Sequence, residues 1–197
     1  MAEVKIDQET TGEVYTMNPK KFGIWLLIVA CVMTFAALTS AYIVRHGEGN
    51  WLEITLPPIL WVSTFVILLS SATLHWAYLS AKKDNLEYVK IALIVTTVLG
   101  CLFLGLQWNA WGELVAHNVW FAGPKSNPAG SFLYVLTGLH AAHIISGIIF
   151  LIIVLNSSFR QDVHSKKLNL IEMCCTFWHF LDFLWVYLFV FLLLNNN

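Results

Sequence analysis

Charged side chains are scarce in this chain of 197 residues. Asp, Glu, Lys and Arg together make up 12% of it, whereas about a quarter of a soluble domain is charged. Hydrophobic residues make up 58%, and the mean hydropathy is +0.69. This composition excludes a soluble domain of useful size and leaves room for about five membrane-spanning helices of ~20–25 residues. The net charge of -1 gives no support to nucleic-acid binding.

The sequence also lacks the short motifs of common enzyme classes. It has no phosphate-binding loop, nucleophile elbow, His-Glu-x-x-His or Cys-x-x-Cys, and no internal repeat of the kind found in many transporters. Its first 20 residues are polar and carry four acids, unlike a signal peptide. The cysteines have neither disulfide-like nor zinc-finger spacing, so we predict that all four are reduced. They are Cys31, Cys101, Cys174 and Cys175.

Apolar runs long enough to cross a bilayer as helices occur five times, since about 20 apolar residues suffice. We therefore predict an all-α polytopic membrane bundle, with a polar tail over residues 1–21 and a five-helix transmembrane domain over 22–197. The spans are expected at about 22–44, 58–79, 89–108, 131–155 and 171–194. The loop 109–130 is long and aromatic-rich, and its first half could extend the third helix or lie along the membrane surface.

Basic residues predict the orientation of the bundle. With five spans, the N-terminal tail and the loops at 80–88 and 156–170 share one side of the membrane. That side carries nine of the 11 Lys and Arg residues, and the other side carries only Arg45 and Lys125. Because cytoplasmic loops are enriched in Lys and Arg, we predict a cytoplasmic N-terminus.

Four ionisable side chains lie deep inside the last two spans. His140 and His143 are three residues apart in the fourth span, and His179 and Asp182 are three apart in the fifth, so each pair shares a helical face. A carboxylate at this depth costs at least ~2.5–3.5 kcal/mol and therefore needs a partner. Since the two spans are antiparallel, we predict an interhelical hydrogen-bond network in which the imidazoles satisfy Asp182.

Two sharper interpretations of the same residues remain open. The two faces supply four possible ligands for a metal or haem, although di-metal bundles use more carboxylates. The other interpretation is that these residues bind and release protons. Further candidates, for a lipid cleft or for helix packing, are Trp61, His75, Gln107, Trp178 and Trp185. Gly138, Ala142 and Ser146 recur every four residues and predict a face for close helix approach.

Two motifs resemble subunit III of haem-copper terminal oxidases. They are Thr137-Gly138-Leu139-His140-Ala141-Ala142-His143-Ile144, preceded by Gly130-Ser131-Phe132-Leu133-Tyr134, and Trp178-His179-Phe180-Leu181-Asp182-Phe183-Leu184-Trp185. Leu60-Trp61 and Leu68-Leu69-Ser70-Ser71 resemble earlier helices of the same family. The resemblance covers nearly all of the chain after residue 19 and is to the short, five-helix bacterial form.

The resemblance implies a subunit with no catalytic residue, haem or copper of its own. Haem and copper are expected in partner subunits, of which oxidase subunits I and II are the first. The complex would be a cytochrome c oxidase of the bacterial cytoplasmic (inner) membrane, which reduces O2 to water and pumps protons. This chain would stabilise the catalytic subunit, hold membrane phospholipids in a cleft, and support proton uptake and oxygen access. It could also join a larger respiratory supercomplex.

Other functions remain possible for this sequence, and at three positions it differs from the family pattern. A quinol oxidase or a nitric-oxide-reductase-associated relative would have a similar subunit III, and a free-standing proton or solute transporter is the alternative from another class. Cys31 stands where many relatives have an acidic residue, and Ala110 where they often have glutamate. Ala141 replaces a usual glycine, which is a mild change.

Overall fold

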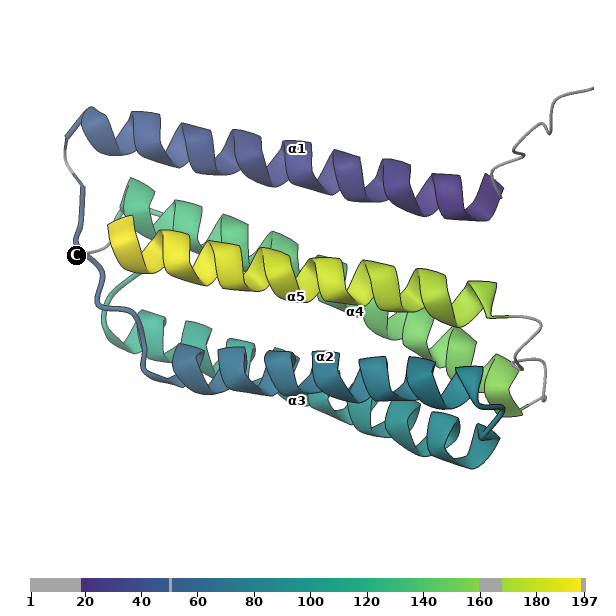
Figure 1. The fold of residues 1–197 in the computed structure, drawn as a ribbon. Coiled ribbons are helices and arrows are strands. Elements are labelled where there is room, and N and C mark those ends of the chain that lie inside the picture. The colour runs from purple at the N-terminus through teal and green to yellow at the C-terminus, as the bar shows by residue number, and fades with distance from the viewer. Residues whose placement is uncertain (1–18, 50, 160–167, 196–197) are drawn as a thin grey trace, which may run out of the picture.

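Five α-helices make up the structure (Figure 1). The computed structural model describes residues 19–49, 51–159 and 168–195, and within these ranges it has no β-strand. All five helices are long and apolar enough to cross a membrane, which confirms the predicted all-α bundle. They are α1 (Pro19–Gly47), α2 (Ile59–Lys82), α3 (Leu86–Ala116), α4 (Pro128–Phe159) and α5 (Asn169–Asn195).

Every helix ends later than its predicted span, and every helix except α2, which begins at Ile59, also begins earlier. Of the predicted polar tail over residues 1–21, residues 1–18 lie outside the described residues, while 19–21 form the first turn of α1. The first half of the 109–130 loop extends α3 to Ala116. Asn127 begins α4 by accepting a hydrogen bond from the backbone N–H of Ala129 at 2.9 Å, as an N-cap residue does.

The helices run antiparallel to their neighbours in the chain (Figure 1). We call the end of the bundle at which α2 passes into α3 the Lys82 end. Helix α5 packs against α1, α2 and α4, while α3 packs against α2 and α4. Half of the apolar stretch of α5 is buried, compared with 22% for α1, so α5 is central and α1 is peripheral.

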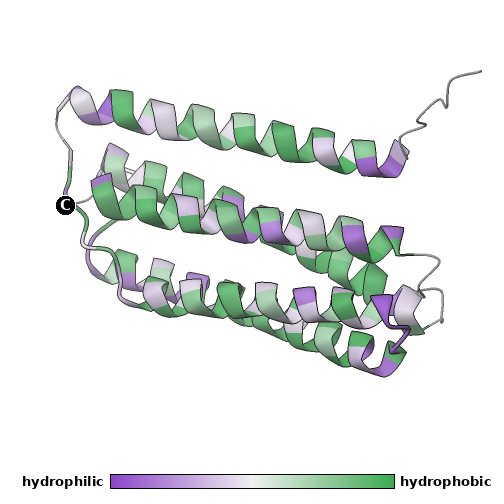
Figure 2. Cartoon of the chain, viewed as in Figure 1, coloured by the Kyte–Doolittle hydropathy of each residue, from purple (hydrophilic) through white to green (hydrophobic). Residues whose placement is uncertain are grey.

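Hydrophobic residues predominate along all five helices (Figure 2), and they lie on the outside of the bundle as well as in its interior. Phe183, Trp108 and Phe65 are each about 70% exposed on the helix surfaces. A helix that is hydrophobic all round needs an apolar surrounding, which the bilayer supplies. The chain is therefore a multi-pass membrane protein. Its orientation, with a cytoplasmic N-terminus, stays a prediction.

Candidate functional site

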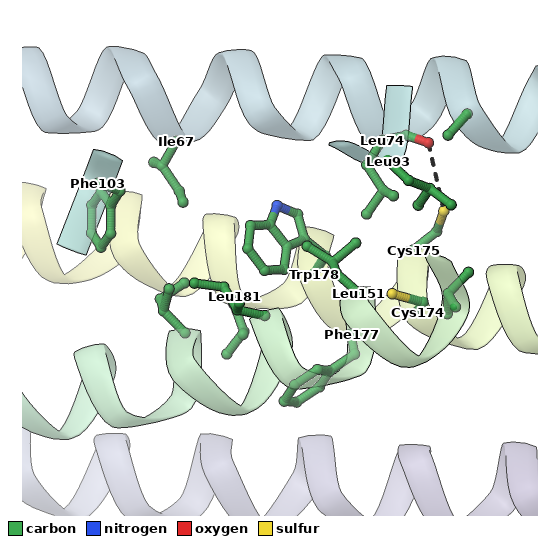
Figure 3. Close-up of a cluster of buried hydrophobic side chains, with 14 of the residues drawn as sticks. Ile67, Leu74, Leu93, Phe103, Leu151, Cys174, Cys175, Phe177, Trp178 and Leu181 are labelled. Carbon is green, nitrogen blue, oxygen red and sulfur yellow. Dashed lines mark hydrogen bonds between the residues drawn. The ribbon is translucent and has the colours of Figure 1, made fainter. Parts of the chain in front are cut away.

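The indole of Trp178 lies where α2, α3, α4 and α5 meet (Figure 3). It is completely buried, and its Nε1–H donates a hydrogen bond to Ser70 Oγ on α2 at 3.0 Å. Two glycines leave room for it. A Cβ at Gly100 of α3 would lie 2.9 Å from Trp178 Cη2, and one at Gly147 of α4 would lie 3.1 Å from Cε3 and Cζ3. The two helices can approach this ring because both positions lack a side chain.

Polar contacts join α5 to α2 along the same interface. Trp185 Nε1–H donates to Thr64 Oγ1 at 3.0 Å. This pair lies about two helical turns from the Trp178–Ser70 pair. Toward the Lys82 end, Cys175 Sγ lies 3.8 Å from the carbonyl oxygen of Leu74, the contact drawn as a dashed line in Figure 3. Thiols are weak donors, so the two indole N–H groups make the stronger hydrogen bonds between α5 and α2. Helix α2 thus supplies hydroxyl groups that satisfy tryptophan N–H groups in an otherwise apolar interior.

His179 and Asp182 also face α2. His179 Nδ1 and Ser71 Oγ share a hydrogen bond of 2.6 Å, and the imidazole lies 6.0 Å, between ring centroids, from that of His75. Asp182 is 3% exposed, and neither carboxyl oxygen has a hydrogen bond. Ser71 is nonetheless the hydroxyl side chain beside that carboxyl group. This face of α5 therefore forms one polar group with α2.

His140 and His143 belong to a second, separate group. His140 is completely buried, and neither ring nitrogen has a hydrogen-bond partner. Its ring is packed against Trp185 at 5.1 Å and Phe103 at 6.0 Å between centroids. His143 donates from Nδ1 to the Leu139 carbonyl oxygen of its own helix at 2.7 Å, and its ring meets Phe35 of α1 at 5.6 Å. These histidines therefore pack against aromatic rings.

The predicted hydrogen bonds between the imidazoles of α4 and Asp182 are absent from the described residues. The sequence correctly predicts that each pair lies on one face of its helix. It does not predict how α5 is rotated about its own axis. Trp178 and Leu181 fill the space against Gly147, so they form the face that α5 turns toward α4. Because His179 and Asp182 are offset from that face, they turn toward α2.

The remaining predicted residues divide between the surface and the interior. Trp61 is 62% exposed and meets Phe189 edge to face, and His75 lies on the outer surface of α2. Gln107 is buried, with its Oε1 lacking a hydrogen bond, and Trp178 and Trp185 are buried between helices.

Close helix approach within the chain occurs at Gly147. It does not occur on the predicted face, where Ala142 and Ser146 are exposed. The sequence reasoning missed Gly100 and Gly147 as contact residues. Isolated glycines inside helical apolar runs were the available signal.

Metal binding finds no support in this geometry. Within residues 19–49, 51–159 and 168–195, no three His, Cys, Asp or Glu side chains are arranged to hold a metal ion. His140 is enclosed by rings, and one nitrogen of His143 and one of His179 are already engaged. These residues do not fit a haem or a copper ion. That haem and copper reside in partner subunits stays a prediction.

The whole-chain pattern matches a known family model. The match is to cytochrome c oxidase subunit III, and it spans residues 3–196. The chain belongs to this family. This confirms the resemblance carried by the motifs of the fourth and fifth spans, and it makes the chain a subunit III of the haem-copper oxidases.

Other subunit III chains match this member over most of their length. The cytochrome bo(3) ubiquinol oxidase subunit 3 of Pseudomonas aeruginosa is 30% identical, with 85% of this chain and 81% of the relative covered. That of Buchnera aphidicola subsp. Baizongia pistaciae is 32% identical, covering 87% and 89%. The cytochrome c oxidase subunit 3 of Thermostichus vulcanus is 26% identical, covering 86% and 84%. Both kinds of oxidase are therefore represented among similar chains.

Proposed function

We propose that this chain is a non-catalytic subunit of a respiratory oxidase in the bacterial cytoplasmic membrane. It packs against the haem-bearing subunit I, with subunit II in the same complex, and the complex reduces O2 to water and pumps protons. The observation that carries the proposal is the family match over residues 3–196. The buried indoles of Trp178 and Trp185 support it, because their N–H groups are hydrogen-bonded to hydroxyl groups of α2 and join helices as in a scaffold.

A quinol is the electron donor best supported by the similar chains. The relatives from Pseudomonas aeruginosa and Buchnera are named as ubiquinol oxidase subunits. Cytochrome c, the donor first expected from the sequence, is supported by the name of the Thermostichus vulcanus relative. The experiment is to purify the complex through a tag on this chain and to compare O2 uptake with ubiquinol and with reduced cytochrome c. Uptake with ubiquinol alone, and no two-copper domain among the partners, is expected. Uptake with cytochrome c would reverse the assignment.

Phospholipid binding is proposed for a groove between α1 and α5. The groove has a volume of about 270 Å³ and is almost wholly apolar. It is lined by Val32, Phe35, Ala36, Phe180, Phe183, Leu184 and Tyr187. Tyr187 and Thr39 share a hydrogen bond of 3.1 Å across the two helices, which keeps their polar groups out of contact with the lipid. An acyl chain suits such a surface, because it offers no hydrogen-bonding partners.

Changing the ionisable side chain at Asp182 or at His143 is expected to weaken the attachment of this chain to the larger subunit. Asp182→Asn changes the group beside Ser71, and His143→Leu changes the contact with Phe35 between α4 and α1. We expect both variants to lose more of this chain during detergent washing and to shorten the working life of the enzyme. The haem absorption of the partner should not change. Ser146→Ala is the control, because its exposed hydroxyl only donates to the His143 carbonyl oxygen. Unchanged retention in both variants would contradict the expectation.

A further inference from the structure

A line of polar side chains leads from the surface of α2 to the buried Asp182. His75 lies on the outer surface of α2, and its ring is 6.0 Å from that of His179 between centroids. His179 Nδ1 is 2.6 Å from Ser71 Oγ, and Ser71 lies beside the Asp182 carboxyl group. All of these residues are on α2 and α5. No part of the proposed packing function requires that they form a connected series.

Among the residues that the structure describes, no cationic side chain is paired with the Asp182 carboxyl group. The ion pairs Lys21–Glu172 and Arg45–Glu48 both lie near helix ends. Asp182 is only 3% exposed, and its oxygens have no hydrogen bond. An ionised carboxylate without a partner in such a place costs several kcal/mol, whereas the neutral acid costs much less. The environment therefore favours the protonated, neutral form of Asp182. A proton needs a route to reach this buried position.

Ser71 is placed to pass that proton. A hydroxyl group is both a donor and an acceptor, and it reorients by rotation about one bond. In the arrangement described, Ser71 Oγ is engaged with His179. Rotation of the hydroxyl directs it to the carboxyl group instead. Ser71 therefore connects the imidazole to the acid without movement of either helix.

The series continues from His179 toward the Lys82 end. The ring centres of His75 and His179 are 6.0 Å apart, so passing a proton between them requires a bridging water molecule. The ring of His75 is 6.3 Å from that of Tyr78, and Lys82 Nζ lies 4.5 Å from the centre of the Tyr78 ring. Lys82 is at the last turn of α2, where the chain leaves the membrane-spanning segment. His75 is about two turns from Lys82, so the series begins on the half of α2 nearest to the water at that end.

The series stops at Asp182 in the opposite direction. Two other hydroxyls of α2, Ser70 and Thr64, are bonded to α5. Ser70 accepts from Trp178 Nε1 and donates to the Ile67 carbonyl oxygen at 2.6 Å. Thr64 accepts from Trp185 Nε1 and donates to the Leu60 carbonyl oxygen at 2.8 Å. With those bonds made, neither hydroxyl has a proton to pass on. Within the part of the chain that the structure describes, this series therefore connects the acid to one side of the membrane, which distinguishes it from a transport path.

We propose that Asp182 is held as a neutral acid and exchanges its proton with water at the Lys82 end through Ser71, His179 and His75. In the inward step, the His179 imidazolium gives its Nδ1 proton to Ser71 Oγ while the Ser71 hydroxyl proton passes to the Asp182 carboxylate. His179 is left neutral and receives a proton again from His75. The reverse steps return the proton to water, so no charge crosses the membrane.

Infrared spectroscopy of the intact complex in its lipid tests this proposal. The carbonyl stretch of a protonated carboxyl group shifts when its hydrogen is replaced by deuterium, and the band that Asp182→Asn removes belongs to Asp182. On transfer to D2O, we expect Ser71→Ala and His75→Leu each to slow the shift roughly 10²-fold, the lower range for a positioned proton-transfer group. Ser146→Ala makes the same chemical change on α4 and should leave the rate unaltered.

Two results would overturn the proposal. If no carboxylic acid band disappears in Asp182→Asn, the group is ionised. If the band is present but Ser71→Ala exchanges at the wild-type rate, the proton reaches Asp182 by another route. Ser71→Ala removes one oxygen atom from the surface of α2, so it keeps the packing needed for the comparison. Neither result depends on which donor reduces the oxidase.

Discussion

Trp178→Ala is expected to destabilise the bundle by about 3–5 kcal/mol, the usual cost of deleting a large buried aromatic side chain. The indole is completely buried and contacts three other helices, and its N–H is bonded to Ser70 Oγ. Alanine would leave a cavity between Gly100 and Gly147, two residues that have no side chain with which to fill it. Thermal unfolding of the purified complex measures the effect. A lowering of the midpoint on the order of 10 °C is expected.

Two further substitutions separate the causes of this effect. Trp178→Phe keeps most of the ring but removes the hydrogen bond to Ser70, so a smaller loss of about 0.5–1.5 kcal/mol is expected. Trp61→Ala deletes a tryptophan that is 62% exposed on α2, and it should lower the midpoint far less. If Trp61→Ala and Trp178→Ala had equal effects, the central position of Trp178 would be wrong.

Gly100→Val is expected to disrupt the same contact from the side of α3. Even the first carbon of a side chain at this position would lie 2.9 Å from Trp178 Cη2 and 3.4 Å from Ile148 Cγ1. The Trp178 ring cannot withdraw, because Gly147 of α4 lies against it as well. Overpacking of this kind typically costs about 1–3 kcal/mol. A lower unfolding midpoint and a lower yield of assembled complex are the expected measurements.

Gly105→Val supplies a matched control on the same helix. A Cβ at Gly105 meets nothing within 4 Å, so valine there has free space. Both substitutions replace a helical glycine by the same residue, and their effects on helix propensity are therefore alike. The difference between the two midpoints isolates the contact with Trp178. Equal midpoints would contradict the close packing described for α3, α4 and α5.

The fold could be predicted from the sequence because apolar run length is a strong constraint in a bilayer. Each of the five runs had to form a helix, since backbone polar groups in lipid must be satisfied internally. The ends were less predictable. Apolar runs mark the hydrocarbon layer, whereas helices continue into the interface. Thus α3 reaches Ala116, about two turns beyond the predicted span.

The contacts of the buried polar residues could be predicted only in part. Spacing in the sequence shows that His179 and Asp182 share a face, but it does not show which neighbour that face meets. The rotation of α5 depends on how Trp178 fits between Gly100 and Gly147, and this is a property of three helices together. Ser70 and Ser71 were visible as small polar residues in an apolar span. Their partners on α5 became clear only from the packing.

The interior histidine His140 shows why a ligand pattern alone is weak evidence. In the sequence alone, two histidines three residues apart, opposite a His–Asp pair, resemble a metal site. In the structure, His140 is surrounded by the rings of Phe35, Phe103 and Trp185. Aromatic rings and an imidazole pack well edge to face, and they leave no space for an ion.

We propose that this chain supports an oxidase without carrying its redox centres. The most direct measurement is the distribution of haem after purification through a tag on this chain, followed by dissociation of the complex. We expect that a larger haem-bearing partner co-purifies, and that all of the haem absorption stays with that partner once this chain is removed. Haem absorption that travels with this chain, or a chain that purifies from native membranes with no haem-bearing partner, would contradict it.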